Sequence, residues 1–413
     1  MLNNFLCVRK IINKIKEMKR TTSTLLLLAL LAASPIVFTA CSKTDDPIDN
    51  NIGDIRTNLK GEVKDGQNLI LESGTYKLTG PLTVKAGGKL TIKPGVIVEA
   101  TPFKSGEEVR YIAVAQGGQI LAEGTKEQPI VFTAADKVQQ AWGGVVICGK
   151  APINKGNTAN AEVSGLPYGG TVVNDNSGIL KYARIEYSGY LYSAEKEFNG
   201  LSMFGVGNGT TIEYVQVHEG SDDGFEWFGG TVNTKYLVST NNEDDQFDWT
   251  EGWVGTNEYW YGKEAANKGN RGIEADNNAN NHLAGPISNP SIKFLTLIGR
   301  GASSSEPQAL KLRVGTKANI DNVVLSNWSV GIDVEHNEGI AYVADGSLKV
   351  TNVKFDQVTT RSKGTKTVPA NSPEGTKGES ADVSKIFTEN ANATGAGAGT
   401  ASPEWAKGWT VGI

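Results

Sequence analysis

The sequence predicts an all-β solenoid with rungs of about 22 residues, and two observations lead to this fold class. The segment IEYVQVHEGSDDGFEWFGG at 212–230 matches TKYLVSTNNEDDQFDWTEG at 234–252 after a shift of 22 residues, with alternating strand-like patterns in both copies. Self-similarity at this period is the signature of a solenoid. The composition agrees: 413 residues include 49 glycines, 3 methionines and 21% charged residues, as in an all-β extracellular protein.

Residues 1–40 are expected to be a signal peptide and not part of the fold. A basic region precedes an apolar run at 25–38 that is too short to span a bilayer. The run leads into Phe-Thr-Ala-Cys, which resembles the lipobox of bacterial lipoproteins and implies that Cys41 carries the lipid. The segment 42–46 is similar to the export tag of Bacteroidetes lipoproteins displayed on the outer membrane, although Thr44 interrupts the usual run.

The charge balance excludes one class of partner. Without residues 1–40 the chain has 34 basic and 44 acidic residues, a net charge of −10. Nucleic-acid binding needs a basic surface, so no nucleic acid is expected. Beyond Cys41 the only cysteine is Cys148, in the apolar run VVIC, so we expect a small buried hydrophobe and no intramolecular disulfide.

The body of the solenoid is expected to cover residues 59–363, after a lipidated cysteine and linker at 41–58. Two segments that each open with Gly-Gly, 87–100 and 117–135, are predicted to be early rungs. Later copies of the unit begin near 180, 291 and 319. Four stretches are expected to be insertions outside the rungs, at 150–178, 190–198, 253–270 and 279–290.

The C-terminal part divides into two further segments. Residues 364–403 are rich in Gly, Ala, Thr and Asn and are expected to form a low-complexity loop. Residues 404–413 contain two tryptophans and are expected to form a closing strand that docks on the body and caps it.

Several of these runs resemble those of a known family. The segments GGQILAEGTKEQPIVFTA, WGGVVICGKAPI, GTTIEYVQV, SDDGFEWFGG and WAKGWT look like those of the Bacteroidetes β-helix lipoproteins and secreted proteins. The resemblance implies a right-handed parallel β-helix in an outer-membrane or secreted setting, often beside TonB-dependent uptake systems. It does not imply a particular activity.

Stacking the second strand of each unit predicts which side chains align. One charged row is expected to contain Glu226, Asp248, Glu274, Lys311 and Asp333. A second row two positions on is expected to contain Phe228, Thr250, Asp276, Arg313 and Glu335. Alternation puts both rows on the outside and places Trp227 and Trp249 in the core. The simplest interpretation of the opposite charges along these rows is a surface ion-pair ladder.

The acidic turns suggest a metal site. Nine acidic residues and a single base, Lys235, lie between 219 and 251. Calcium prefers about six to eight oxygen ligands, which adjacent carboxylate turns can supply. The calcium ligands are predicted to be Asp222, Asp223, Asp244 and Asp245, with Glu226 and Asp248 as further candidates. The structural alternative is that Asp and Asn occupy tight turns for their backbone hydrogen bonding.

Aromatic residues near the acidic turns suggest a glycan ligand. Trp253, Tyr259, Trp260 and Tyr261 fall in the predicted insertion, and exposed rings beside carboxylates suit sugars. The alternative is that these rings pack the inserted loop onto the helix.

The function predicted from these patterns is that of a lipid-anchored outer-membrane protein facing the cell exterior. It would bind a glycan through these aromatic residues with Glu226 and Asp248, as an accessory to a TonB-dependent importer. A calcium-dependent polysaccharide lyase or glycoside hydrolase is the enzymatic alternative, with Lys311 or Arg313 as the basic residue of a lyase. No nucleophile motif, phosphate loop or zinc spacing supports another enzyme class. A structural or adhesive surface protein is the third interpretation.

Overall fold

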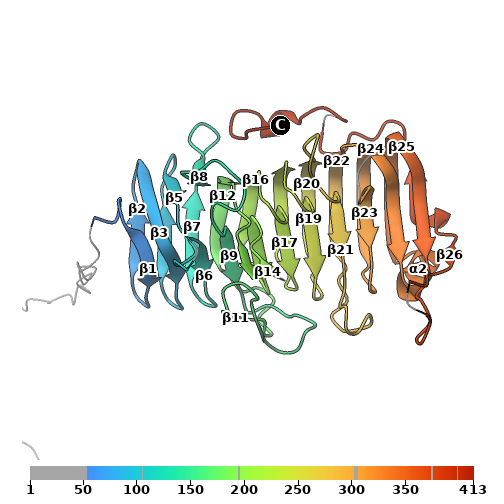
Figure 1. The fold of residues 1–413 in the computed structure, drawn as a ribbon, viewed down its shortest axis with the longest axis horizontal. Coiled ribbons are helices and arrows are strands. Elements are labelled where there is room, and N and C mark those ends of the chain that lie inside the picture. Colours follow the sequence, from blue (N-terminus) through green and yellow to red (C-terminus); the bar gives the residue numbers. More distant parts are fainter. Residues whose placement is uncertain (1–53, 105, 194–195, 302–305, 374, 398) are drawn as a thin grey trace, which may run out of the picture. The chain divides into compact units, whose positions relative to one another are not determined.

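The computed structural model describes residues 54–413 apart from 105, 194–195, 302–305, 374 and 398. The predicted signal peptide, Cys41 and residues 41–53 of the linker lie outside the described residues. The described chain folds as a right-handed parallel β-helix, as predicted, in which 23 strands pair into one continuous sheet (Figure 1). No helix among the described residues has the length and apolar character needed to cross a membrane.

The strands form three faces, here called A, B and C, which the chain visits in that order in each rung. Face A begins with β2 (Asn68–Leu71), β4 (Lys89–Ile92) and β7 (Gln119–Glu123). Face B contains β5 (Ile97–Ala100) and β8 (Ile130–Ala134), while β1 (Leu59–Val63) and β3 (Thr75–Val84) pass from face B to face C.

Face C is built from short strands that pair in chain order. They are β6 (Ile112–Val114), β9 (Val145–Cys148), β15 (Leu201–Phe204), β17 (Phe225–Phe228), β19 (Phe247–Thr250), β21 (Ile273–Ala275) and β23 (Gln308–Leu312).

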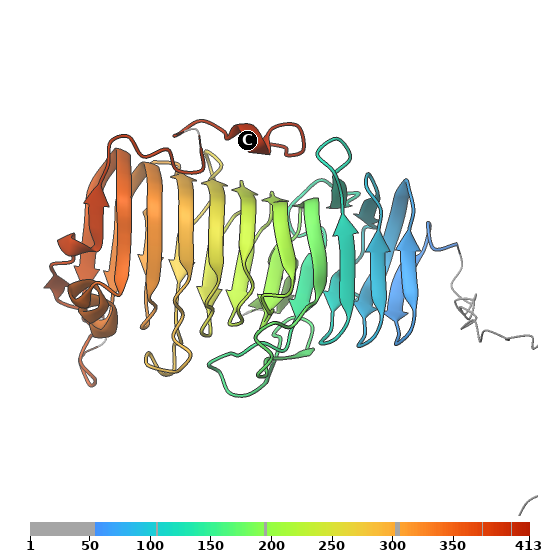
Figure 2. The ribbon, with the colours of Figure 1, turned by 180° about the vertical axis from the view of Figure 1, so that it is seen from behind.

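Seven longer strands bend from face A to face B, and the last two continue onto face C. They are β12 (Gly178–Glu186), β16 (Thr211–His218), β18 (Thr234–Thr240), β20 (Thr256–Lys263), β22 (Ser291–Ile298), β24 (Ala318–Glu335) and β25 (Leu348–Thr365). Figure 2 shows successive strands side by side along the molecule.

Each bend from face A to face B is made by one residue with positive φ. Five of these are aromatic, and their rings stack in a column with centroids 4.3 to 4.8 Å apart, which matches the spacing of strands in a sheet. The bend residues are Tyr182, Tyr214, Tyr236, Tyr259, Phe294, Asn322 and Asn352.

The predicted rungs and core are confirmed. Lys89 pairs with Gln119 and Ile97 with Val131, so the two early Gly-Gly segments are neighbouring rungs. Trp227 and Trp249 are fully buried and in register, as the 22-residue shift requires. The aligned apolar side chains form a continuous core, and burial of their surface is the main favourable contribution to the stability of the β-helix.

The long insertions pack on the outside of the helix. The stretch 150–178 contains β10 (Ala159–Asn160) and β11 (Pro167–Tyr168), and the stretch 190–198 contains β13 (Leu191–Ser193) and β14 (Lys196–Glu197). The predicted insertion at 253–270 is wrong for residues 256–263, because β20 is a regular part of a rung that pairs with β18 and β22.

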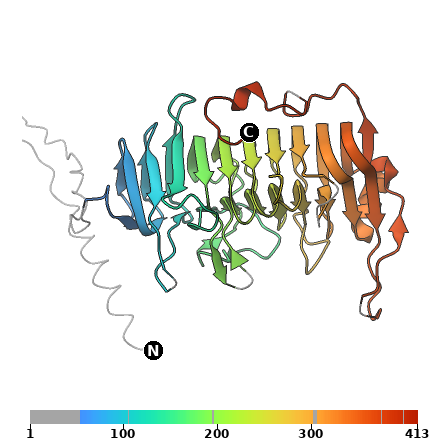
Figure 3. The ribbon, with the colours of Figure 1, turned by 45° about the horizontal axis from the view of Figure 1, so that its top comes forward.

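The C-terminal region also differs from the expectation. It contains β26 (Ser380–Ala381), η1 (Ser384–Ile386), β27 (Phe387–Glu389) and the single turn η2 (Glu404–Ala406), so the predicted closing strand is absent from 404–413. The segment from Asn390 onward returns along the outside of face B instead of capping an end (Figure 3). At the C-terminal end of the β-helix, the core is closed by Val343 of α2 (Asn337–Asp345) with Val383 and Ile386.

Candidate functional site

The acidic residues gather at the corner where the chain passes from face B to face C. The turn before β17 carries Asp222 and Asp223, and the turn before β19 carries Asp244 and Asp245. Because β17 and β19 pair in register, the two turns lie directly over one another. The backbone N–H of Asp245 donates a 3.0 Å hydrogen bond to Oδ1 of Asp223, which fixes this stacking.

The four predicted metal ligands come together and a fifth carboxylate joins them. Oxygens of Asp222, Asp223 and Asp244 all lie within 4.8 Å of one another, and so do oxygens of Asp223, Asp245 and Asp248. The two groups share Asp223. We call these five aspartates the acidic site. Their oxygens offer the hard donor set that calcium prefers.

Burial makes the charged forms of these groups costly. The side chains of Asp223 and Asp245 are 6% and 2% exposed. Loss of water raises the pKa of both residues and of Asp248 well above the usual value, and the neighbouring carboxylates add to the effect. The same two causes, burial first, raise the pKa of Asp222 to about 8. Without a cation, these carboxyl groups therefore keep their protons to a higher pH than an exposed aspartate does.

Residues of the next turn supply most of the compensation. The backbone N–H of Arg271 donates to Oδ1 of Asp245 at 2.7 Å, and its guanidinium lies 3.6 Å from Oδ2. The Nδ2 of Asn270 donates to Asp244. The described residues form no hydrogen bond to the carboxylate of Asp248, which has the carboxylates of Glu226 and Glu274 as neighbours.

Glu226 stands beside the acidic site on face C. It pairs in register with Asp248, as predicted, and accepts a hydrogen bond from Nδ2 of Asn199. Burial, and then the charge of Glu162 from the 150–178 insertion, raises its pKa well above the usual value. The pKa of Glu197 in β14 is also raised, by burial and then by the charge of Asp244 in the acidic site. Both insertions therefore border this corner.

The charged row along face C has the predicted register. Lys311 pairs in register with Asp333 and forms a 2.9 Å ion pair with it, and Arg313 contacts Asp276 at 2.9 and 3.0 Å. The expected ion-pair ladder is confirmed, but its solvent exposure is not. Asp333 is 0% exposed because Lys311 and Lys363 reach over it from the two neighbouring rungs.

The aromatic part of the predicted ligand site is wrong for three of four residues. Trp253 and Trp260 are fully buried in the core, where each stacks on Trp227, at 4.5 and 4.9 Å between ring centroids. Tyr261 is 2% exposed because the C-terminal segment covers it, with Trp409 in the same cluster. These rings have no free face to offer a sugar.

Tyr259 is partly exposed but its ring is also occupied. It is part of the column of stacked rings, between Tyr236 at 4.8 Å and Phe294 at 4.5 Å. Only the ring edge faces outward, so contact with the flat face of a sugar is prevented. The alternative, that the rings pack an inserted loop onto the helix, is also wrong, because Tyr259, Trp260 and Tyr261 belong to a regular strand of a rung and Trp253 lies in the core.

Sequence reasoning missed Asn199, Asn270 and Arg271 as neighbours of the acidic site. Asn270 and Arg271 belong to the turn before β21, which is three residues longer than the turns before β17 and β19 and carries no paired aspartates. Arg271 donates a hydrogen bond to Asp245 although it is 26 residues further along the chain, and a comparison of the sequence with itself at a shift of 22 residues does not align the two.

Comparison with known proteins agrees with this architecture. The family model described as "Pectate-lyase like beta helix domain" matches residues 61–410. No curated protein matches the chain, and no solved structure does. The match covers nearly all rungs, both acidic turns and the returning C-terminal segment, so the chain belongs to the family of pectate-lyase-like β-helix domains.

Proposed function

We propose that this protein is a lipid-anchored outer-membrane β-helix that binds an extracellular acidic glycan through calcium held at the acidic site. The observation that carries the proposal is the pair of carboxylate triads that share the buried Asp223. A β-helix domain of the pectate-lyase-like family is compatible with a glycan-related function. An accessory role beside a TonB-dependent importer remains part of the proposal.

The donor set explains the choice of calcium. Five aspartates supply oxygens only, and calcium accepts about six to eight oxygen ligands in flexible geometry. Asp248 has no hydrogen-bond donor among the described residues and has the carboxylates of Glu226 and Glu274 as neighbours, so a cation would relieve repulsion between these groups. Asp222 and Asp244 are only half-buried, which leaves room for ligand oxygens on the bound ion. A carboxylate of an acidic sugar is the natural such ligand.

Calorimetry on the protein after chelation tests the metal site. Calcium is expected to bind with measurable heat and to raise the melting temperature, since a ligand that binds only the folded state stabilises it. Asp223→Asn should weaken both effects strongly. Glu243→Gln removes the same charge from an exposed residue of the neighbouring acidic turn, the one before β19, and should leave both effects intact. Absence of heat and of any thermal shift in the unmodified protein would refute the site.

Retention on polysaccharides then tests the ligand class. Immobilised polygalacturonate or alginate should retain the protein in calcium and release it when a chelator is added. Retention that does not respond to the chelator would contradict the calcium-bridged mode. Labelled fatty acid incorporated into the full-length protein, but not into a Cys41→Ser variant, together with protease accessibility on intact cells, tests the anchor and its orientation.

A calcium-dependent polysaccharide lyase or a glycoside hydrolase is the second candidate, favoured by the guanidinium of Arg271 beside the acidic site. Removal of the α-proton of a uronate needs a basic group near the metal. Arg271 is held in ion pairs with Asp245, Glu274 and Glu306, and Arg313 with Glu274 and Asp276, which argues for binding over catalysis. Release of unsaturated oligosaccharides would establish the lyase, and release of saturated ones the hydrolase.

A further inference from the structure

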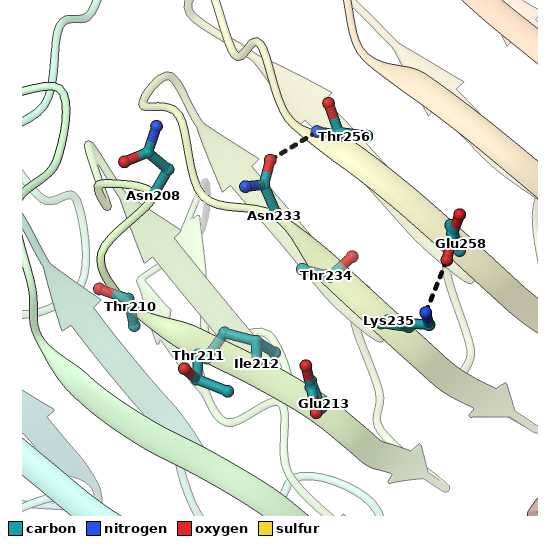
Figure 4. A pocket seen from close by; sticks show the side chains of 10 residues that line it. All are labelled: Asn208, Thr210, Thr211, Ile212, Glu213, Asn233, Thr234, Lys235, Thr256 and Glu258. Carbon is teal, nitrogen blue, oxygen red and sulfur yellow. Dashed lines mark hydrogen bonds and ion pairs between the residues drawn. The ribbon is translucent and has the colours of Figure 1, made fainter.

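A recess of about 330 Å³ lies on face A, where three neighbouring strands begin (Figure 4). This volume is within the range of small-ligand sites, about 300 to 1,000 Å³. The recess is remote in the fold from the acidic site, since it lies on another face. Its lining consists of Asn208, Thr210, Thr211, Ile212, Glu213, Asn233, Thr234, Lys235, Thr256 and Glu258.

The rim of the recess is a row of hydroxyl and amide groups, one from each rung. Thr211, Asn233 and Thr256 each precede residues that pair in register, Ile212 with Thr234 and Thr234 with Asn257. The row continues past the recess through Ser291 and Asn319, again in register. Consecutive groups are therefore about 4.8 Å apart, the spacing of neighbouring strands.

The floor beneath this row is rigid. Thr234 and Asn257 are 2% and 1% exposed, and Oδ1 of Asn257 accepts hydrogen bonds from both the N–H and the hydroxyl of Thr234, at 2.9 and 2.8 Å. The buried indole of Trp260 donates to the same hydroxyl at 3.0 Å. A ligand in the recess would therefore meet a preformed surface, which lowers the entropy cost of binding.

Several polar groups of the rim have no partner within the part of the chain that the structure describes. These are the hydroxyls of Thr211 and Thr256 and the side-chain amide of Asn208. The side chain of Asn233 uses Oδ1 to accept from the N–H of Thr256 at 2.7 Å, which leaves its Nδ2 as a free donor. The rim thus presents both donors and acceptors, as sugar hydroxyls require.

A second row, two residues further along each strand, selects the charge of the ligand. The charges of this row alternate in sign along the helix axis, so they cancel. Lys235 forms a 2.7 Å ion pair with Glu258, and Lys181 lies 3.9 Å from Glu213. A polyanion would meet as much repulsion as attraction here. The row consists of Lys181, Glu213, Lys235, Glu258, Lys293 and Asp321.

We propose that this recess binds a neutral linear oligosaccharide whose chain runs along the helix axis, with successive sugars on successive rungs. In an extended β-1,4-linked chain each sugar advances by nearly the interval between strands, so successive sugars, turned over in alternation, would each lie beside a hydroxyl or amide of the row. The site is independent of the calcium-dependent function proposed above, because it lies on another face and contains no member of the acidic site.

Calorimetry in the presence of a chelator tests the proposal with hexasaccharides of β-1,4-glucan, β-1,4-mannan, β-1,4-xylan and α-1,4-glucan. At least one β-1,4-linked probe is expected to bind. Thr211→Val and Thr256→Val keep the side-chain shape and should each weaken that binding by up to about tenfold, the value of one hydrogen bond. Thr360→Val makes the same change at an exposed threonine on face C, outside this row, and should change the affinity less than about twofold.

Three outcomes would overturn the proposal. They are no binding of any β-1,4-linked probe, binding that is unchanged in both Thr211→Val and Thr256→Val, or binding of hexagalacturonate in chelator that is tighter than the binding of every neutral probe. Because chelation removes the calcium site, success here with failure of the calcium experiments would separate the two proposals. The reverse result would separate them equally well. Circular dichroism of all three valine variants should match that of the unmodified protein, since each substitution is exposed or half-buried.

Discussion

The carboxylate of Asp223 accepts a hydrogen bond from the backbone N–H of Asp245, the residue that occupies the equivalent position one rung later. This contact places Asp223 in both carboxylate triads of the acidic site. A single side chain therefore links two turns that are 22 residues apart in the chain.

Replacing this carboxylate should have opposite effects with and without calcium. In chelator, Asp223→Asn is expected to raise the free energy of unfolding by about 1 kcal/mol, because it removes a buried carboxyl group whose ionised form is costly beside the neighbouring carboxylates and keeps an oxygen acceptor for Asp245. In calcium, the variant should be less stable than the unmodified protein because a ligand is lost. Denaturant unfolding in both buffers measures the two differences, and equal effects in both would contradict a metal site.

The raised pKa values predict how stability responds to pH without metal. Asp222 has a pKa of about 8 in the folded protein and 3.8 as a reference. The folded state thus holds this proton when the unfolded state has lost it, so stability falls as pH rises from about 4 to about 8. The chelated protein should melt at a lower temperature at pH 8 than at pH 5. A melting temperature that rises over this interval would contradict the prediction.

Calcium should reverse this trend. Binding requires deprotonated carboxylates, so calcium affinity should increase with pH over the same interval and proton release should accompany binding. Calorimetry in two buffers of different ionisation enthalpy measures the released protons. Glu243→Gln should leave proton release unchanged, whereas Asp222→Asn should reduce it.

Buried and exposed ion pairs in this protein should contribute differently to the free energy of unfolding. Lys311→Met leaves the fully buried Asp333 with only the half-exposed Lys363 as a basic partner, and the cost should approach about 3 kcal/mol, as for a broken buried pair. Lys407→Met breaks an exposed pair with Glu404 and should change stability by less than about 0.5 kcal/mol. Denaturant unfolding measures both, and equal costs would contradict the assigned burial.

Truncation of a core aromatic tests the corrected assignment of the predicted ligand residues. Trp260→Ala removes a fully buried indole that stacks on Phe247 at 4.6 Å and should lower the free energy of unfolding by about 3 to 5 kcal/mol. If Trp260 instead served a ligand, glycan retention would be lost while stability stayed near its original value. Thermal unfolding and retention assays on one preparation distinguish these results.

The sequence contained enough information for the repeat but not for everything that packs on it. The 22-residue shift correctly aligned Glu226 with Asp248 and brought the acidic turns together, because register in a parallel sheet carries over to the turns beside it. The next rung is 23 residues on, with Lys235 opposite Glu258. That one added residue concealed β20 and made core aromatics look like loop residues.

Burial from outside the repeat was beyond reach for a different reason. Tyr261 points outward from face B by alternation, and its burial depends on a C-terminal segment that is distant in sequence and has no periodic signal. The same holds for Glu162, whose insertion reaches Glu226 across face C. Periodicity predicts which residues share a rung and leaves the covering segments unplaced.

The returning C-terminal segment has a consequence for how the molecule melts. In a stack where each layer touches only its neighbours, disorder can start at either end and spread one layer at a time. Here Asn322 receives the N–H of Thr394, while the amide of Gln216 exchanges two hydrogen bonds with the backbone of Val411. The C-terminal segment thus connects rungs that have no direct contact with one another. The last rungs are therefore expected to unfold together with the middle of the helix.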